Sequence, residues 1–359
     1  MNEQMTVTLA GGKTTNVLYL DDLNELAIKL GAYGSRALLV ADSNTANLFK
    51  RLPPNNIILE PGEGSKNLGS VEKILRTAVS VGLGRDDCII GFGGGVVCDL
   101  AAFAASIYMR GCNLILVPTS LLCMVDATLG GKTGFDFMGG KNLVGSFYPA
   151  NEVLICPPTL KSLNEREYHN GLAEVLKHAI LSKDELLYKF LISRKSQILE
   201  REPNTLLNLL QLSLEVKKSY IEKDPEEKHG IRQALNLGHT FGHALESSGR
   251  FSKFSHGEGV AWGCCCALEA GYLMGLTPKE YMKLGKKLFA TYKYDIDYKI
   301  GRGDWLDFIN YVSHDKKKVD GVVQFVLMKG QGKFVLTPVP NDIIMRSTLL
   351  NPNCNSQKI

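Results

Sequence analysis

Several features that mark secreted, membrane or nucleic-acid-binding proteins are missing from this sequence. Residues 1–12 contain neither a basic segment nor an apolar stretch, so we expect no signal peptide. The mostly apolar run 259–276 is interrupted by Gly263, Glu269 and Gly271, which predicts a buried helix and not a membrane span. No run of five Lys or Arg residues occurs and the net charge is only +4, so we expect no nucleic-acid partner.

Paired cysteine motifs are also missing. The nine cysteines include no CxxC spacing, and three of them are adjacent at positions 264–266. Adjacent cysteines do not suit a single tetrahedral zinc site. Because unpaired cysteines are mostly small buried side chains in reducing compartments, the sequence predicts free thiols and a cytoplasmic protein.

The 359 residues exceed what one hydrophobic core usually organises, so we expect two domains. Up to residue 157, short apolar strands such as 36–40 alternate with segments of helical periodicity such as 68–81, which indicates a parallel sheet with crossover helices. From Glu165 to about Tyr292 the pattern is almost wholly helical, and a late hairpin follows. We therefore predict an α/β domain over residues 1–157 and an all-α domain, apart from that hairpin, over residues 158–359.

The stretch 93–147 carries three glycine-rich turns. The first, Gly93–Gly95, follows an apolar strand and precedes a helix predicted over 99–110. Glycine there lets backbone N–H groups approach a pyrophosphate at a helix N-terminus, so this turn predicts a nucleotide site. The turns at 130–134 and 139–142 each place a lysine beside glycine, which suits an anionic small molecule.

A candidate metal site appears in the helical half. His239 and His243 are four residues apart, so they share one helical face and can bind a divalent cation, although they can equally be structural histidines. His256 opens a later helix, and Glu174 lies near the start of an apolar one with Lys177 three residues on. A buried glutamate needs a partner, and a metal would supply one.

Six cations lie beside glycine-rich turns or inside apolar helices: Arg110, Lys132, Lys141, Lys177, Lys217 and Arg232. Each alone is an ordinary solvated side chain. Together they predict a pocket for a substrate with at least two negative charges. Asp99 and Asp126 are expected either to pair with these cations or to belong to the site.

The chain resembles the 3-dehydroquinate synthase family over nearly its whole length. The matching segments occur in the family's order: GGGVVCDLAAF (93–103), YMRG (108–111), PTSLL (118–122), VDATLGGKTG (125–134), GKNLVGSFY (140–148), EREYHNGLAEVLK (165–177), LNLGHTFGHALE (235–246), HGEGVAWG (256–263) and DKKK (315–318). So many ordered motifs are far more specific than one glycine-rich loop.

The resemblance implies a Rossmann-like NAD-binding domain, a helical domain, a divalent metal (zinc or cobalt) and a homodimer. It implies that Glu174, His239 and His256 are the metal ligands and that His243 is not one. The implied NAD contacts are Asp42, Asn44, Glu63, Lys66, Gly94, Gly95, Val96, Asp99, Thr119, Ser120, Lys132, Lys141 and Ser162. The implied substrate contacts are Asp126, Lys132, Asn142, Lys177, Lys217, Arg232, Asn236, His243 and one lysine of 316–318, taken as Lys316, while Arg110 resembles the arginine lent to a partner subunit's phosphate site.

The reaction implied by the resemblance converts a sugar acid phosphate, 3-deoxy-D-arabino-heptulosonate 7-phosphate, to 3-dehydroquinate and phosphate in the shikimate pathway. It is a lyase reaction in which NAD is reduced and then regenerated. Three alternatives stay open: a related cyclase acting on sedoheptulose 7-phosphate, an NAD- and metal-dependent polyol dehydrogenase, and a non-catalytic protein stabilised by zinc.

The sequence departs from the family pattern at a few positions. Each departure is a small or polar residue. Cys98 and Ala102 stand where the family has glycine, Asp136 where it has asparagine, Cys156 where it has aspartate and Gly259 where it has alanine. The segment 224–232 is one residue longer than usual, which leaves open whether Lys217 or Lys218 contacts the substrate. None of these changes removes an implied metal ligand.

Overall fold

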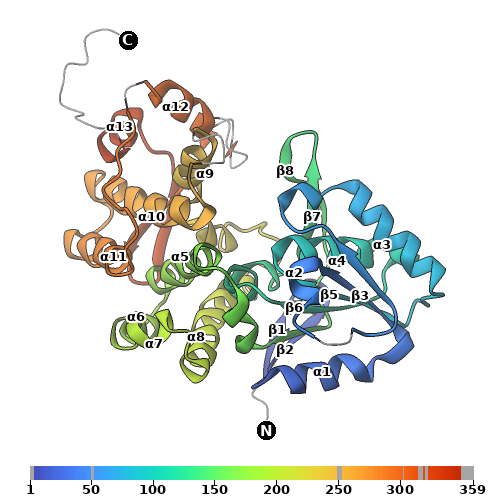
Figure 1. Cartoon of the computed structure of the whole chain (residues 1–359). Helices are drawn as coiled ribbons and strands as arrows, with labels where there is room; N and C mark the ends of the chain where they lie inside the picture. Colours follow the sequence, from blue (N-terminus) through green and yellow to red (C-terminus); the bar gives the residue numbers. More distant parts are fainter. Residues whose placement is uncertain are drawn as a thin grey trace. The chain divides into compact units, whose positions relative to one another are not determined.

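The structure, a computed structural model, describes residues 4–49, 52–248, 253–301, 303–313, 318–319 and 322–348 (Figure 1). The chain forms two compact units, Met1–Gly171 with Ser196–Glu226 and Leu172–Lys195 with Glu227–Ile359. The first unit is α/β and the second is helical apart from short hairpins, so the predicted fold class is confirmed. The domain boundary near residue 157 stays a prediction.

A seven-stranded sheet organises the first unit, in the order β1-β2-β9-β6-β5-β3-β4. The β1–β2 pair is antiparallel, as expected for a hairpin around Gly11-Gly12, and the other neighbours are parallel. The strand bounds are β1 (Gln4–Thr8), β2 (Thr14–Tyr19), β3 (Ala37–Asp42), β4 (Asn56–Leu59), β5 (Cys88–Gly93), β6 (Asn113–Pro118) and β9 (Glu152–Ile155).

Both faces of the parallel strands are covered. Side chains alternate between the two faces of a strand, and Leu39 and Ile90 join Leu26 of α1 (Leu23–Ala32) in one buried cluster. On the other face, Gly91 lies against Ala101 of α4 (Gly95–Ile107), and α3 (Leu68–Ser80) packs beside α4. Burial on both faces explains why these strands are continuous apolar runs in the sequence.

The strand order reverses between β3 and β5. The connection after β3 leads outward to β4, whereas the connection after β5 leads through α4 to β6 on the other side. In such sheets ligands bind at the carboxyl ends of the strands next to the reversal. This position coincides with the turn Gly93–Gly95.

Two predicted details of this unit are wrong. The helix expected over 99–110 begins at Gly95 and ends at Ile107, because Gly94 is its N-cap and Gly95 its first residue. Residues Lys132–Gly134 are not part of a turn: they begin β7 (Lys132–Phe137), which pairs antiparallel with β8 (Gly140–Phe147).

The first unit also contains α2 (Ser43–Ala46), most of α7 (Lys195–Leu199) and α8 (Pro203–Ile221). Helix α5 (Glu165–Leu181) begins in the first unit and continues into the second. The remaining elements of the second unit are α6 (Leu186–Ser193), α9 (His239–Ser248), α10 (His256–Leu273), α11 (Lys279–Thr291), α12 (Trp305–Ser313), α13 (Asn341–Thr348), β10 (Lys318–Val319), β11 (Val322–Val323), β12 (Phe325–Gly330) and β13 (Lys333–Thr337). The predicted late hairpin is the β12–β13 pair.

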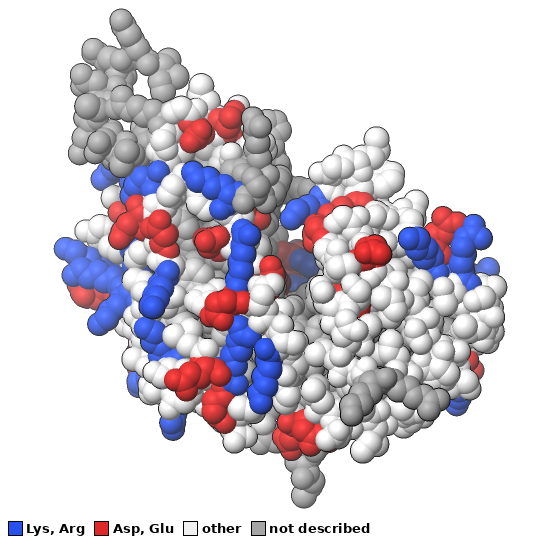
Figure 2. Space-filling view, in the orientation of Figure 1, with Lys and Arg blue, Asp and Glu red and all other residues white. Residues whose placement is uncertain are grey.

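Charged side chains of both signs are interspersed on the face drawn in Figure 2. Some ion pairs of the described residues lie within one helix, such as Arg76–Glu72 and Lys189–Glu185. Within the part of the chain that the structure describes, no helix combines the length and the apolar character needed to cross a bilayer. The eight cysteines of that part are buried free thiols.

Candidate active site

A buried carboxylate lies at the centre of a polar cluster in the second unit. Glu174 of α5 has no exposed surface, and its Oε1 lies 3.5 Å from His239 Nε2 and 3.4 Å from His256 Nε2. Lys177, one helical turn further along α5 and also buried, forms an ion pair with Oε2. One ligand atom from each of Glu174, His239 and His256 lies within 4.8 Å of the others. The structure therefore brings together the three residues that the resemblance named as ligands.

This cluster has the features of a metal site. Among the described residues, neither oxygen of Glu174 accepts a well-directed hydrogen bond, although both are buried. Burial alone would raise the pKa of Glu174, but the charges of Lys177, His239 and His256 hold it well below its usual range. An ionised carboxylate and two imidazoles facing one point are a typical zinc or cobalt donor set with room for further ligands.

The two histidines lie on α9 and α10, which pack in close contact. A Cβ on Gly242 would lie 2.6 Å from Gly259 O, and one on Gly263 would lie 2.1 Å from Gly238 O. Glycines at these positions therefore allow the two backbones to approach. His239 begins α9 and His256 begins α10, where the side chain of Ser255 caps the helix N-terminus.

Other predicted residues of the second unit lie around this cluster or apart from it. His243 is exposed, with its ring centroid 5.2 Å from that of His239. Arg232 is buried in the short 3-10 turn that ends at Asn236, whose Nδ2 donates to Glu227 Oε1 at 3.0 Å. Lys316 lies outside the described residues.

The carboxyl edge of the parallel sheet forms a second candidate site, in the first unit. Asp42 ends β3 and caps α2 through a bond from Thr45 N, while Thr45 Oγ1 donates to Phe92 O of β5. Gly94 is the N-cap residue of α4, whose first turn has no side-chain cap among the described residues. A Cβ on Gly95 would meet nothing within 4 Å, so there is open space beside this turn. These features suit a pyrophosphate.

The remaining predicted nucleotide contacts of this unit follow the same edge or lie on loops. Thr119 and Ser120 follow β6, and Thr119 N donates to Gly93 O at 2.9 Å. The other members are Asn44 in α2, Val96 in the first turn of α4, and Ser162, whose hydroxyl donates to Thr159 O in the 3-10 turn Pro157–Ser162.

A buried ion pair lies at the same edge. Lys66 Nζ donates to Asp99 Oδ2 of α4 at 2.6 Å. Burial raises the pKa of Asp99 to about 6, although the charge of Lys66 opposes the shift. Burial would lower the pKa of Lys66, but Asp99 outweighs it and raises that pKa. The more exposed pair Lys141–Glu63 is longer, at 3.9 Å.

The predicted substrate contacts of the first unit are less uniform. Lys217 of α8 is buried and its Nζ donates to the Asp126 side chain, in a short π-helical turn over Cys123–Ala127. Asn142 sits on β8 with a positive φ of 49°, held by a 2.7 Å bond from its N–H to Asp136 Oδ1. Lys132 begins β7 and is exposed, as is Arg110, which follows α4 with a φ of 66°.

Sequence reasoning missed two carboxylates at these sites. Asp136, noted only as a departure, fixes the Asn142 backbone. Glu246, which closes the motif LGHTFGHALE, is buried with its Oε1 3.3 Å from His256 Nδ1. The signal was present, because Glu246 follows His239 by seven residues and so lies on the same face of α9.

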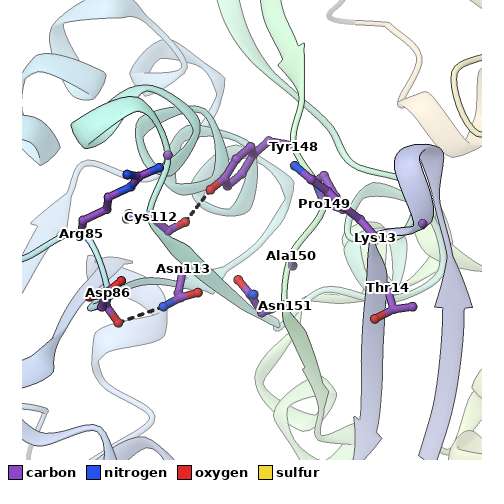
Figure 3. A pocket seen from close by; sticks show the side chains of 12 residues that line it. Lys13, Thr14, Arg85, Asp86, Cys112, Asn113, Tyr148, Pro149, Ala150 and Asn151 are labelled. Atoms are coloured by element: carbon purple, nitrogen blue, oxygen red, sulfur yellow. Dashed lines mark hydrogen bonds between the residues drawn. The ribbon is translucent and has the colours of Figure 1, made fainter.

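A separate cavity of about 490 Å³ opens at the opposite, amino edge of the sheet (Figure 3). Arg85 and Asp86 precede β5, Asn113 begins β6, and Tyr148 donates to Cys112 O at 2.6 Å. No predicted site residue lines it, so we do not take it as the active site.

Comparison with known proteins adds the family context. Family models described as "3-dehydroquinate synthase N-terminal" and "3-dehydroquinate synthase C-terminal" match residues 56–170 and 171–318. The chain is 36% identical over 337 residues to 3-dehydroquinate synthase of Dictyoglomus turgidum, covering 92% of this chain and 93% of that protein.

Two solved structures share the fold. A 2-deoxy-scyllo-inosose synthase, complexed with carbaglucose-6-phosphate, NAD+ and Co2+, has a TM-score of 0.83 at 24% identity, covering 96% of this chain and 98% of that one. The 2-epi-5-epi-valiolone synthase ValA of Streptomyces hygroscopicus, with NAD+ and Zn2+, has a TM-score of 0.82 at 24% identity, covering 95% and 97%. At this identity the likeness concerns the fold alone.

Proposed function

The chain belongs to the 3-dehydroquinate synthase family, and we propose that it converts 3-deoxy-D-arabino-heptulosonate 7-phosphate to 3-dehydroquinate and phosphate. The family models cover both units, and the relatives of that name match most of the chain. The observation that carries the proposal at the site is the cluster of Glu174, His239 and His256 around the buried Glu174 carboxylate, with Lys177 beside it. The overall reaction is a lyase reaction with no net oxidation.

The chain would hold two cofactors on separate sets of residues. A divalent cation, zinc or cobalt, on Glu174, His239 and His256 supplies Lewis acidity toward a substrate hydroxyl. NAD at the carboxyl edge of the sheet supplies a reversible hydride acceptor. Gly94 and Gly95 would face its pyrophosphate, and Asp42 and Asp99 would lie at the strand and helix ends beside it.

Lys177 has two roles in this proposal. Its buried ammonium group compensates the negative charge of Glu174 in the folded protein. It also provides a fixed positive charge close to the donor set, where negative charge develops on the substrate as phosphate leaves. Because the group is already desolvated and held in place, it needs no reorganisation during the reaction.

The remaining substrate contacts stay proposals of the same kind. Lys217, held by Asp126, and buried Arg232 are cations of fixed position, which suits a carboxylate and a phosphate. Asn142, Lys132, Asn236, His243 and Lys316 complete the proposed set. Homodimer formation, with Arg110 reaching a partner subunit's substrate, and a cytoplasmic location belong to the proposal too; the free thiols support a reducing compartment.

The test is phosphate release from 3-deoxy-D-arabino-heptulosonate 7-phosphate with substoichiometric NAD and added zinc, followed together with NADH absorbance. We expect phosphate in many-fold excess over NAD with no accumulation of NADH. Release from sedoheptulose 7-phosphate alone would keep the mechanism and change the substrate. Steady NADH formation from a polyol, with no phosphate release, would overturn the lyase function.

A further inference from the structure

One buried carboxylate next to the trio has no role in the reaction described above. Glu246 lies near the end of α9, and 8% of its side chain is exposed. Its Oε1 is 3.3 Å from His256 Nδ1, while His256 Nε2 lies 3.4 Å from Glu174 Oε1. The two nitrogens of one imidazole thus face two different carboxylates.

We propose that Glu246 is a positioning residue, which accepts the Nδ1–H of His256 and so directs the Nε2 lone pair toward the metal position, and that Gly259 provides the space for its carboxylate. This inference rests on the proposed metal site. A neutral imidazole carries one N–H, and only the other nitrogen can bind a cation. An acceptor at Nδ1 therefore fixes both the tautomer and the direction of the ring.

The surroundings of His256 favour an acceptor of this kind. The His256 side chain is 30% exposed, more than those of Glu174 and His239, so surrounding atoms restrain its ring less. His256 is also the first residue of α10, so helical backbone flanks it on its C-terminal side only. The Glu246 carboxylate reaches it from the neighbouring helix α9, whose His239 belongs to the same trio. Glu246 thus links the ring of one ligand to the helix that carries another.

Gly259 makes this contact possible in the observed form. A Cβ at this position would lie 2.8 Å from Glu246 Oε1 and 3.2 Å from its Cγ. Real Cβ atoms essentially never come within 3.0 Å of another heavy atom, so an alanine would force the carboxylate to move.

The experiment measures cobalt affinity and not only turnover. The full-length protein is freed of metal with a chelator and titrated with Co2+ against a competing dye, and the visible spectrum of bound Co2+ is recorded. For Glu246→Ala we expect about 10–100-fold weaker binding. Glu246→Gln keeps an acceptor oxygen and should lose less, and Gly259→Ala should fall between wild type and Glu246→Ala. A changed cobalt spectrum in these variants would show an altered ligand geometry, which a purely structural defect does not produce.

Two controls match the substitutions. Glu269→Gln removes a carboxylate that pairs with Lys286. Glu269 lies on α10, the helix of His256, about 20 Å along it from that histidine. Gly31→Ala adds a methyl group to a helix where it would meet nothing within 4 Å. Both should bind cobalt as wild type does. If Glu246→Ala does not fold, Gly259→Ala decides the question, because it leaves every polar group in place.

Three outcomes would overturn the proposal. Wild-type cobalt affinity in the folded Glu246 and Gly259 variants would show that the contact does not position His256, while the proposed function would stand. Two cobalt ions per wild-type chain, falling to one in Glu246→Ala with the tighter affinity unchanged, would make Glu246 a ligand with His243 in a second site. No cobalt binding to the wild type would refute the metal site itself and this inference with it.

Discussion

Two carboxylates, the buried Glu174 in the second unit and the partly buried Asp99 in the first, each lie beside a lysine, yet their pKa values move in opposite directions. Glu174 is held well below its usual range, whereas the pKa of Asp99 rises to about 6. Burial pushes both upward. Glu174 has two imidazoles facing it in addition to Lys177, while Asp99 has only the charge of Lys66 against the nearby Glu63 and Asp126.

The difference shows what each region is built to hold. In the Glu174 region, an ionised carboxylate and two imidazoles face one another, and this arrangement suits a cation. The Asp99 region surrounds a helix N-terminus and glycine backbone, which suits an anionic nucleotide. One site depends on buried side chains and the other mainly on backbone, so we expect substitutions in the first to cost more.

The largest effect should come from removing the cation. A chelator should abolish phosphate release, and zinc or cobalt should restore it, because Glu174, His239 and His256 are the proposed donor set. The check is activity before and after metal analysis, with mock-treated protein as the control. Full activity in protein shown to be free of metal would contradict the proposal that the Glu174 region holds a catalytic cation.

Lys177→Met should have the next largest effect, because it removes the buried positive charge that pairs with Glu174. We expect phosphate release to fall by about 10²–10³-fold, since a buried, fixed charge is lost while the volume is kept. Circular dichroism checks that the metal-loaded variant is folded. Lys286→Met, which breaks the partly exposed pair with Glu269, is the matched control and should retain activity. Near-normal turnover of Lys177→Met would contradict the role of this charge.

The sequence predicted the backbone-based region well. Strands β3, β5 and β6 are apolar runs because both faces of the sheet are buried, and glycines after β5 mark the helix N-terminus. The sequence pattern predicted a glycine-rich turn where the β7–β8 hairpin lies. Gly134 and Gly145 face each other there, and a Cβ on Gly145 would lie 2.0 Å from Thr133 O, so these glycines serve close strand pairing and not a turn.

Local spacing predicted part of the side-chain region as well. Glu174 and Lys177 are three residues apart on one helix, and their pairing follows from that spacing. The contact of Glu246 with His256 and the pairing of Lys66 with Asp99 depend on how separate elements pack, over 10 and 33 residues of chain. No local pattern encodes such distances, and motif resemblance names residues without pairing them.

A moderate effect is expected from Gly95→Ala. The added Cβ meets no protein atom, so the fold should be as stable as before, but it occupies space in front of the uncapped first turn of α4. We expect the KM for NAD to rise about tenfold, or ~1.4 kcal/mol of binding, with little change in kcat. Gly31→Ala is the control. An unchanged KM for NAD would place the pyrophosphate elsewhere.

The smallest effect should be the acid sensitivity of NAD binding. Because the pKa of Asp99 is about 6, its carboxylate takes up a proton at mildly acidic pH, whereas Glu174 stays ionised there. If the ionised form of Asp99 binds the nucleotide, affinity should be a few-fold weaker at about pH 5.5 than at neutral pH, since one proton competes. The free energy of unfolding should depend on pH with the opposite sign. Because its pKa is raised, Asp99 binds its proton more tightly in the folded protein than in the unfolded chain. Its contribution to stability therefore falls as pH rises from about 4 to about 6. Titration of NAD by fluorescence across this range checks the first expectation. Asp99→Asn should give weaker binding with a flat profile, and an unchanged slope in that variant would assign the acid sensitivity to another group.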